Sequence, residues 1–108
     1  MTGSKEIENS TELELTLSEK LLAETARINW HELQRFFAQG SVLKVDDSLN
    51  LLHVAEYIAS DDTKAMQPLI TKALVAAPDN DTARRWYEQN TMLWSVVVAP
   101  YVLVQDKD

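Results

Sequence analysis

The sequence carries an almost unbroken apolar segment near its C-terminal end, Leu93-Trp94-Ser95-Val96-Val97-Val98-Ala99-Pro100-Tyr101-Val102-Leu103-Val104. Its apolar residues occupy consecutive positions instead of alternate ones, a pattern typical of a strand that is covered on both faces. Pro100 has no N–H group to donate to a ladder, so it marks a bulge, a bend or a sheet edge. We therefore expect this segment to form the central strand of the core.

Outward from that segment, the sequence predicts an α+β fold of about five short helices packed on a small two- or three-stranded sheet with a central C-terminal strand. The natural partner strand is Ser41–Val45, which is rich in β-prone apolar residues and ends at Asp46-Asp47. Leu74–Ala77 is a further short strand candidate. Apolar residues at helical spacing predict helices at about Leu17–Ile28, Trp30–Gln39, Leu51–Ala59, Thr63–Ala73 and Asn80–Gln89.

Capping residues indicate where the first two helices begin and end. Thr16 and Glu19 have the spacing of a capping box, and Asn29 and Glu32 repeat this spacing at the second helix. Gly40 follows the second helix at the position where a positive φ is common, so it is the expected stop.

The starts of the next two helices leave alternatives open. Asp47 or Asn50 caps the third helix, and Asp61 or Asp62 caps the fourth. Pro68 lies inside the fourth helix, where it removes a backbone hydrogen bond, so we expect a kink or a later start.

Length and charge limit the number of domains and the classes of partner that we expect. The 108 residues contain no repeat, and we expect one folded domain over residues 16–106 after a disordered acidic tail over residues 1–15. The formal net charge is -7, and Arg84-Arg85 is the only adjacent basic pair. Nucleic acids and anionic membranes are bound through clustered Lys and Arg, so we expect neither as a partner.

Missing residue types narrow the chemistry further. The sequence contains no cysteine, which removes disulfides, thiolate nucleophiles and Cys-ligated metals. Its two glycines are too few for a phosphate-binding loop, so we expect no nucleotide cofactor, and indeed no cofactor of any kind. Residues 1–15 lack the apolar core of a signal peptide, and the longest apolar run, Val96–Val104, is too short to span a bilayer. These patterns predict a cytoplasmic protein.

Three sets of polar side chains are candidates for chemistry. His31-Glu32 pairs an imidazole with a carboxylate, but neighbours on a helix diverge by about 100° and do not converge on one ion. Asp46-Asp47 and Asp61-Asp62 supply up to four carboxylates, which would suit Mg²⁺, Ca²⁺ or acid–base roles if their loops meet. Aspartate also caps helices and closes turns, which is the simpler interpretation. His53 has no second ligand at metal spacing.

Two long stretches, together with Val45-Asp46 and Asp61-Asp62, resemble a known family. They are Glu24-Thr25-Ala26-Arg27-Ile28-Asn29-Trp30-His31-Glu32-Leu33-Gln34-Arg35-Phe36-Phe37-Ala38-Gln39-Gly40 and Leu93-Trp94-Ser95-Val96-Val97-Val98-Ala99-Pro100-Tyr101-Val102-Leu103-Val104-Gln105. These residues look like the small bacterial proteins of the domain-of-unknown-function 2288 family, over about Leu21 to Gln105. The resemblance implies a bacterial cytosolic protein and carries over no activity and no catalytic residue.

We assign no catalytic, cofactor-binding or metal-binding residue from the sequence. The favoured hypothesis is a non-catalytic interaction or structural protein, because no catalytic set of residues stands out and the apolar C-terminal strand and the aromatic residues require cover. An unknown protein partner or a second copy, in a homodimer, would supply that cover. The alternative is a small metal-dependent or acid–base enzyme that uses His31-Glu32 with Asp46-Asp47 and Asp61-Asp62, and it requires at least three of these side chains to converge.

Overall fold

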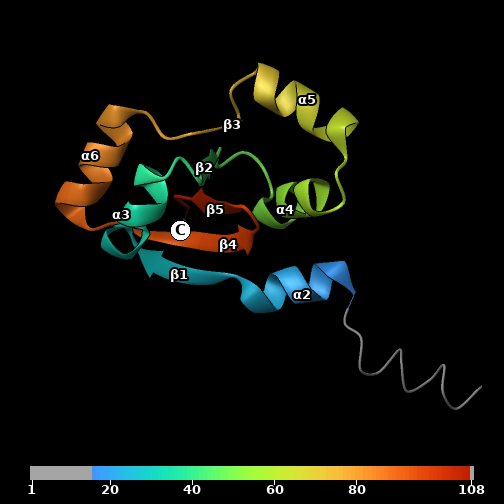
Figure 1. The fold of residues 1–108 in the computed structure, drawn as a ribbon, viewed down its shortest axis with the longest axis horizontal. Helices are drawn as coiled ribbons and strands as arrows, with labels where there is room; N and C mark the ends of the chain where they lie inside the picture. The colour runs from blue at the N-terminus through green and yellow to red at the C-terminus, as the bar shows by residue number, and fades with distance from the viewer. Residues whose placement is uncertain (1–15, 108) are drawn as a thin grey trace, which may run out of the picture.

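A five-stranded mixed β-sheet with helices on both faces organises residues 16–107, the part of the chain that this computed structural model describes (Figure 1). In chain order the elements are α2 (Leu17–Glu24), β1 (Ala26–Asn29), α3 (Trp30–Ala38), β2 (Val42–Val45), α4 (Leu51–Ala59), α5 (Thr63–Thr71), β3 (Val75–Ala76), α6 (Asn80–Gln89), β4 (Met92–Val98) and β5 (Tyr101–Gln105). The fold is α+β, as predicted, but the expectation of two or three strands is wrong. The expected acidic tail, residues 1–15, lies outside the described residues.

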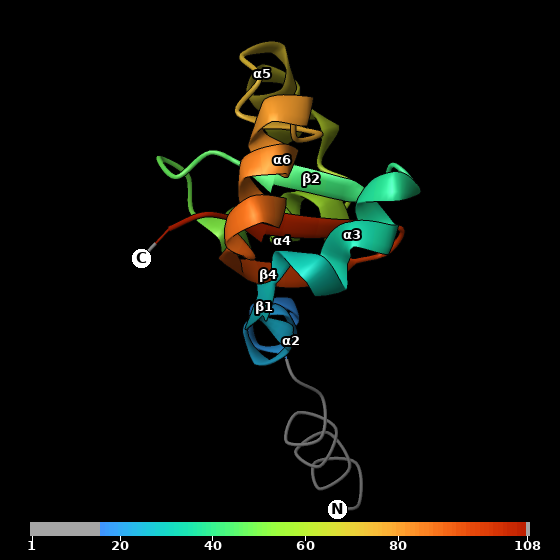
Figure 2. The same ribbon diagram turned by 90° about the vertical axis from the view of Figure 1, so that its left-hand side faces the viewer.

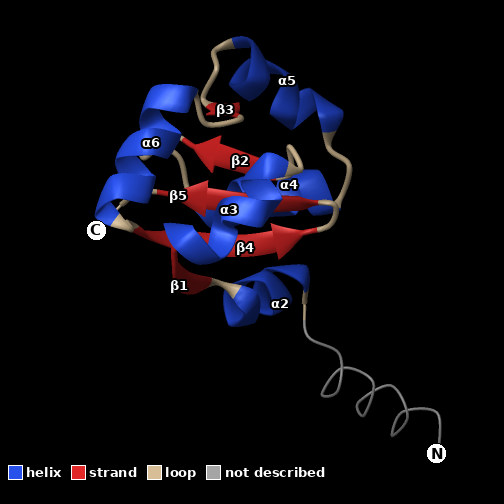
Figure 3. Cartoon of the chain, turned by 60° about the vertical axis from the view of Figure 1, so that its left-hand side comes forward, coloured by secondary structure: helices blue, strands red, loops and turns tan. Residues whose placement is uncertain are grey.

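The strands lie in the order β1-β4-β5-β2-β3. Every neighbouring pair is antiparallel except β5 and β2, which are parallel. Figure 3 shows β1 and β3 at the two edges of this sheet, with β5 in the middle. The edge strands β1 and β3 are short, and β2 is as short as β1. Short edge strands limit the number of unpaired backbone groups at the two edges of the sheet.

The apolar C-terminal segment forms two strands and not the single strand that we expected. β4 and β5 make an antiparallel hairpin in which Val96 lies opposite Leu103 and Val97 opposite Val102. The chain reverses at Ala99-Pro100, whose peptide bond is cis. Proline tolerates this position because a residue in the turn donates nothing to the ladder, so the bend is the alternative that holds for Pro100. β5 is central and pairs with β2, which confirms the predicted partner strand.

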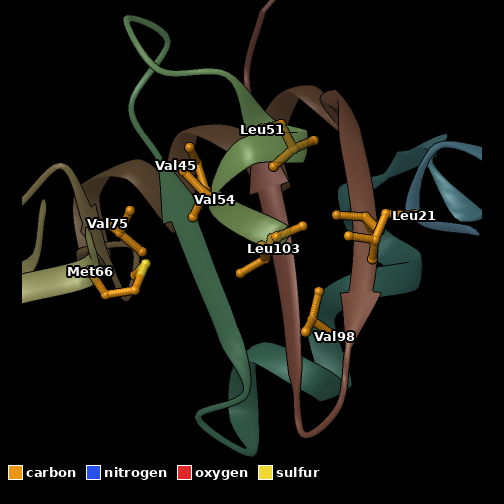
Figure 4. Packing of buried hydrophobic residues seen from close by; sticks show 10 residues of the cluster. Leu21, Val45, Leu51, Val54, Met66, Val75, Val98 and Leu103 are labelled. Carbon is orange, nitrogen blue, oxygen red and sulfur yellow. The ribbon is translucent and has the colours of Figure 1, made fainter. Parts of the chain in front are cut away.

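Alternation along this hairpin divides the core into two clusters, one on each face of the sheet. Val98 and Leu103 belong to the cluster beneath α2, α4 and α5 (Figure 4). Val102 and Val104 belong to the other cluster, beneath α3 and α6. Figure 2 shows α3 and α6 in front of the sheet and α4 behind it. Because successive side chains of a strand point to opposite faces, helices on both sides explain why the apolar residues are consecutive.

The first helix ends earlier than its apolar spacing predicts. The capping box at Thr16 is present, but α2 stops at Glu24, and residues 26–29 form β1 instead of further helical turns. Ile28 lies opposite Leu93 of β4, and its side chain packs on the cluster beneath α3 and α6. The β-branched Ile28 suits a strand, and the edge of β4 offers ladder hydrogen bonds that local periodicity cannot reveal.

The other helices begin at predicted caps. The side chains of Asn29, Asn50 and Asp62 each accept a hydrogen bond from a backbone N–H three residues ahead, which decides the open alternatives for Asn50 and Asp62. Gly40 follows α3 with φ +77°, as expected for a stop. No helix within residues 16–107 is both long and apolar enough to cross a membrane.

Helix α5 runs through its proline. It begins at Thr63, so the expectation of a later start is wrong, and it continues past Pro68 to Thr71. The missing N–H of Pro68 leaves the carbonyl of Lys64 without its helical donor. Both residues are exposed, so water can hydrogen-bond that carbonyl at little cost.

Candidate functional site

His31 connects two helices and does not face the other candidate residues. Its Nε2 lies 2.9 Å from the backbone carbonyl oxygen of Tyr87, and the two ring centroids are 4.7 Å apart. Its backbone N–H donates to the side-chain oxygen of Asn90 at 3.0 Å. These contacts join the first turn of α3 to the last turn of α6, so His31 has a structural task at this junction.

Asn90 is a residue that the sequence analysis missed. It ends α6 in the left-handed conformation, with φ 44°, which asparagine tolerates better than most residues. Its side chain then reaches the N-terminus of α3 and accepts the hydrogen bond from His31. The signal available in the sequence was an asparagine directly after the predicted end of a helix at Gln89.

An open depression of about 780 Å³ runs along α3 and includes His31 and Glu32. It is lined by Ile28, His31, Glu32, Leu33, Gln34, Arg35, Phe36 and Ala38. Glu32 is exposed, and the guanidinium of Arg35 lies 4.8 Å from the centroid of the Phe36 ring. The depression contains neither aspartate pair, so its polar groups follow one helix surface without converging on a point.

The first aspartate pair closes a turn. One carboxylate oxygen of Asp46 accepts hydrogen bonds from the hydroxyl of Ser48 at 2.5 Å and from its backbone N–H at 3.0 Å. The hydrogen bond from the Ser48 hydroxyl lowers the pKa of Asp46 most, and the one from the Ser48 backbone N–H lowers it further. The positive charge of Lys44 makes a smaller contribution in the same direction. Asp47 is exposed beside it. Asp46 is therefore held as an ionised turn residue and is poorly suited to donate a proton.

The second aspartate pair lies between α4 and α5, at the far end of α4 from the first. Asp62 accepts the backbone N–H of Ala65 at 3.1 Å, and Asp61 adopts a left-handed conformation with φ 57°. The nine residues of α4 span about 13 Å, which separates the two pairs. His53 is exposed on the same helix.

The candidate residues therefore do not form one site. Within residues 16–107 there is no group of three or more His, Asp or Glu side chains placed to hold a metal ion. The metal-dependent or acid–base enzyme hypothesis requires at least three of these side chains to converge, and in this part of the chain they do not.

A second concave surface lies between α4, α5 and the start of β5. Two adjoining hollows of about 340 Å³ and 290 Å³ share Thr63, Met66 and Ile70. We call their combined surface the α4–α5 hollow; it is lined by Leu43, Tyr57, Ile58, Asp61, Asp62, Thr63, Met66, Gln67, Ile70, Thr71 and Tyr101. Ile70 is 59% exposed and Tyr101 is 38% exposed, so both side chains present apolar surface to water at this hollow.

The hollow is open because α5 covers the sheet incompletely. Met66 is the single buried residue that α5 contributes to the core. Leu43 of β2 and Tyr101 of β5 lie at the hairpin end of the sheet, where Leu43 remains half-buried and Tyr101 exposed. Within residues 16–107, Asp61 and Asp62 are the only charged residues that line the hollow. Such a surface can bind an apolar group beside a positive charge.

Among solved structures, the NMR solution structure of PA1075 from Pseudomonas aeruginosa is similar to this chain. The two share 43% sequence identity, with a TM-score of 0.75, and the similarity covers 91% of each chain. No curated protein matches the sequence. The family model described as "Protein of unknown function (DUF2288)" matches residues 16–106, in agreement with the resemblance noted in the two long stretches. The chain therefore belongs to the DUF2288 family of proteins of unknown function.

Proposed function

We propose that this chain is a non-catalytic interaction protein of the bacterial cytosol and that the α4–α5 hollow is its partner-binding surface. The observation that carries the proposal is that the exposed side chains of Ile70 and Tyr101 line the same concave, mainly apolar hollow. Covering such a surface with a partner removes apolar area from water, which lowers the free energy. Tyrosine is also enriched among residues that dominate binding energies.

The tasks of the polar candidates support a binding role. His31 contacts the end of α6, Asp62 caps α5 and Asp46 closes a turn, so each has a structural explanation. The similarity to a Pseudomonas protein supports a bacterial setting. A second copy of the chain and an unrelated protein are both partners that this surface would accept.

A crosslinking pull-down from the native cell tests the proposal with three forms of the protein: wild type, Ile70→Ser/Tyr101→Ser, and the matched control Val97→Ser. Val97 is 56% exposed, close to Ile70, but it lies on the opposite face of the sheet. Val97 and Ile70 are more than half exposed, so replacing either should change stability by about 0.5 kcal/mol or less, whereas Tyr101 is 38% exposed and its loss should cost about 1 kcal/mol. Thermal unfolding checks that all three forms are folded at the temperature of the pull-down.

We expect a specific partner to be retained by Val97→Ser and lost by the double variant. If the partner is a second copy, gel filtration with light scattering should show a dimer for the wild type and a monomer for the double variant. Equal recovery of every crosslinked species by all three forms would reject the α4–α5 hollow as the binding surface.

A further inference from the structure

On the basis of the proposed function, we infer that the α4–α5 hollow binds an extended segment of a partner protein that carries a Lys or Arg next to a large apolar anchor residue. The lining of the hollow combines apolar side chains with two carboxylates, those of Asp61 and Asp62. The chemistry of the occupant follows from that combination of burial and charge.

Among the described residues, no Lys or Arg lines the hollow. Asp61 and Asp62 are exposed, and neither carboxylate is within ion-pair distance of a Lys or Arg among residues 16–107, where the ion pair present joins Arg84 and Asp81 at 2.8 Å. Lys64 lies in the first turn of α5 but does not line the hollow. The side chain of Asp62 accepts one hydrogen bond at the cap, and a carboxylate can accept several, so it can also accept a hydrogen bond from a ligand.

Aromatic rings and overall charge favour the same kind of occupant. Tyr57 and Tyr101 both line the hollow, and the faces of aromatic rings attract the guanidinium of Arg and the ammonium of Lys. The formal net charge of -7 draws a basic segment toward the chain and repels an acidic one.

The size of the hollow favours side-chain anchors. Its two parts, of about 340 Å³ and 290 Å³, are near the lower limit of ligand pockets, about 300 Å³. Adjoining pockets of this size suit successive anchors of an extended peptide, with the basic residue placed beside Asp61 and Asp62.

Selection from a random 12-residue peptide library displayed on phage tests this inference with the full chain as bait. We expect enriched peptides to place Lys or Arg within about four positions of an aromatic or large aliphatic residue. A synthetic copy of an enriched peptide then serves as the probe, and its Kd is measured against the wild type and Asp61→Asn/Asp62→Asn. Asparagine keeps the cap at position 62 and tolerates the left-handed backbone at position 61, so this variant should fold normally.

Loss of two exposed ion pairs should raise Kd roughly 2- to 30-fold, and this difference should fade in about 1 M salt, where charges are screened within ~3 Å. The control Asp47→Asn/Glu88→Gln removes two exposed carboxylates that do not line the hollow, and it should leave Kd almost unchanged.

The outcomes separate the inference from the proposed function. Peptides that require Ile70 but lack Lys and Arg, or that bind Asp61→Asn/Asp62→Asn as tightly as the wild type, would overturn the basic chemistry and leave the binding surface intact. Peptides whose binding is indifferent to Ile70→Ser, or failure to enrich any peptide, would overturn the inference, while the pull-down with Ile70→Ser/Tyr101→Ser decides the proposed function.

Discussion

Replacing Leu103 by alanine should destabilise the protein strongly, because this side chain is fully enclosed between the sheet and α4. Leu103 lies on β5, the middle strand, with 0% of its surface exposed, and it belongs to the cluster beneath α2, α4 and α5 (Figure 4). Leu→Ala substitutions at buried sites cost about 2–5 kcal/mol, and the cost rises when the neighbours cannot collapse into the space. Because neighbouring strands and a helix enclose Leu103, we expect about 3–5 kcal/mol.

Urea unfolding followed by tryptophan fluorescence measures this loss, since Trp30 and Trp86 are fully buried in the folded chain. With a slope of about 2 kcal/mol per M urea, the midpoint should fall by about 2 M. The matched control is Val97→Ala in the same hairpin, where the side chain is 56% exposed and the expected change is within about 0.5 kcal/mol.

A loss of less than about 1 kcal/mol for Leu103→Ala, or one no larger than that for Val97→Ala, would refute the reasoning. Either result would mean that the C-terminal hairpin does not lie in the interior. The position of the α4–α5 hollow would then be wrong as well, because Tyr101 at the start of β5 forms part of its lining.

Two further predictions concern the helices. Pro68→Ala should raise the unfolding free energy by about 1–3 kcal/mol in the same urea assay, because it removes the clash of the proline ring with the preceding helical turn and restores a helical N–H. The greater flexibility of the unfolded chain offsets part of this gain, and a lower midpoint would contradict the prediction. Asp79 caps α6, and its carboxylate accepts hydrogen bonds from the backbone N–H of Thr82 and from the Thr82 hydroxyl, which lower its pKa. Its contribution to stability is therefore present above the ordinary Asp pKa and is lost as the pH falls through the lowered pKa of the folded state. Asp79→Asn retains the cap, so urea midpoints measured at pH 6 and at about pH 3 should differ less for this variant than for the wild type; an equal difference would assign the acid sensitivity to other groups.

Much of the helical structure was predictable because caps and stops are local. Leu51–Ala59 and Asn80–Gln89 have the predicted bounds, and Thr16, Asn29 and Gly40 act as their residue types indicate. A cap requires only a side chain and a backbone N–H a few residues away, so the signal lies within one short window of sequence.

The errors arise where two elements compete for the same residues. The apolar spacing of residues 17–28 suited a continuous helix, yet residues 26–29 pair with β4 because the hairpin edge lies beside them. The segment from Leu93 to Val104 was predicted as a central strand, but its division into a hairpin depends on the turn at Pro100 and on β1 and β2 at its sides.

The candidate site depends still more on the tertiary arrangement. From residue types alone, Asp46-Asp47 and Asp61-Asp62 were candidates for one shared site. Helix α4 separates them, because one pair lies before its start and the other after its end. The α4–α5 hollow unites side chains from β2, α4, α5 and β5, and no sequence motif connects Leu43, Ile70 and Tyr101.

The amino-acid sequence by itself determined that this chain has a buried β core flanked by short capped helices, because burial patterns and caps depend on residues close together in the chain. The sequence also identified the family. Only the tertiary structure decided the number and order of the strands, the dispersal of the polar candidates and the position of the exposed apolar hollow. Strand pairing and surface shape depend on contacts between distant segments, and the free energy of each contact depends on which other surface remains to be covered.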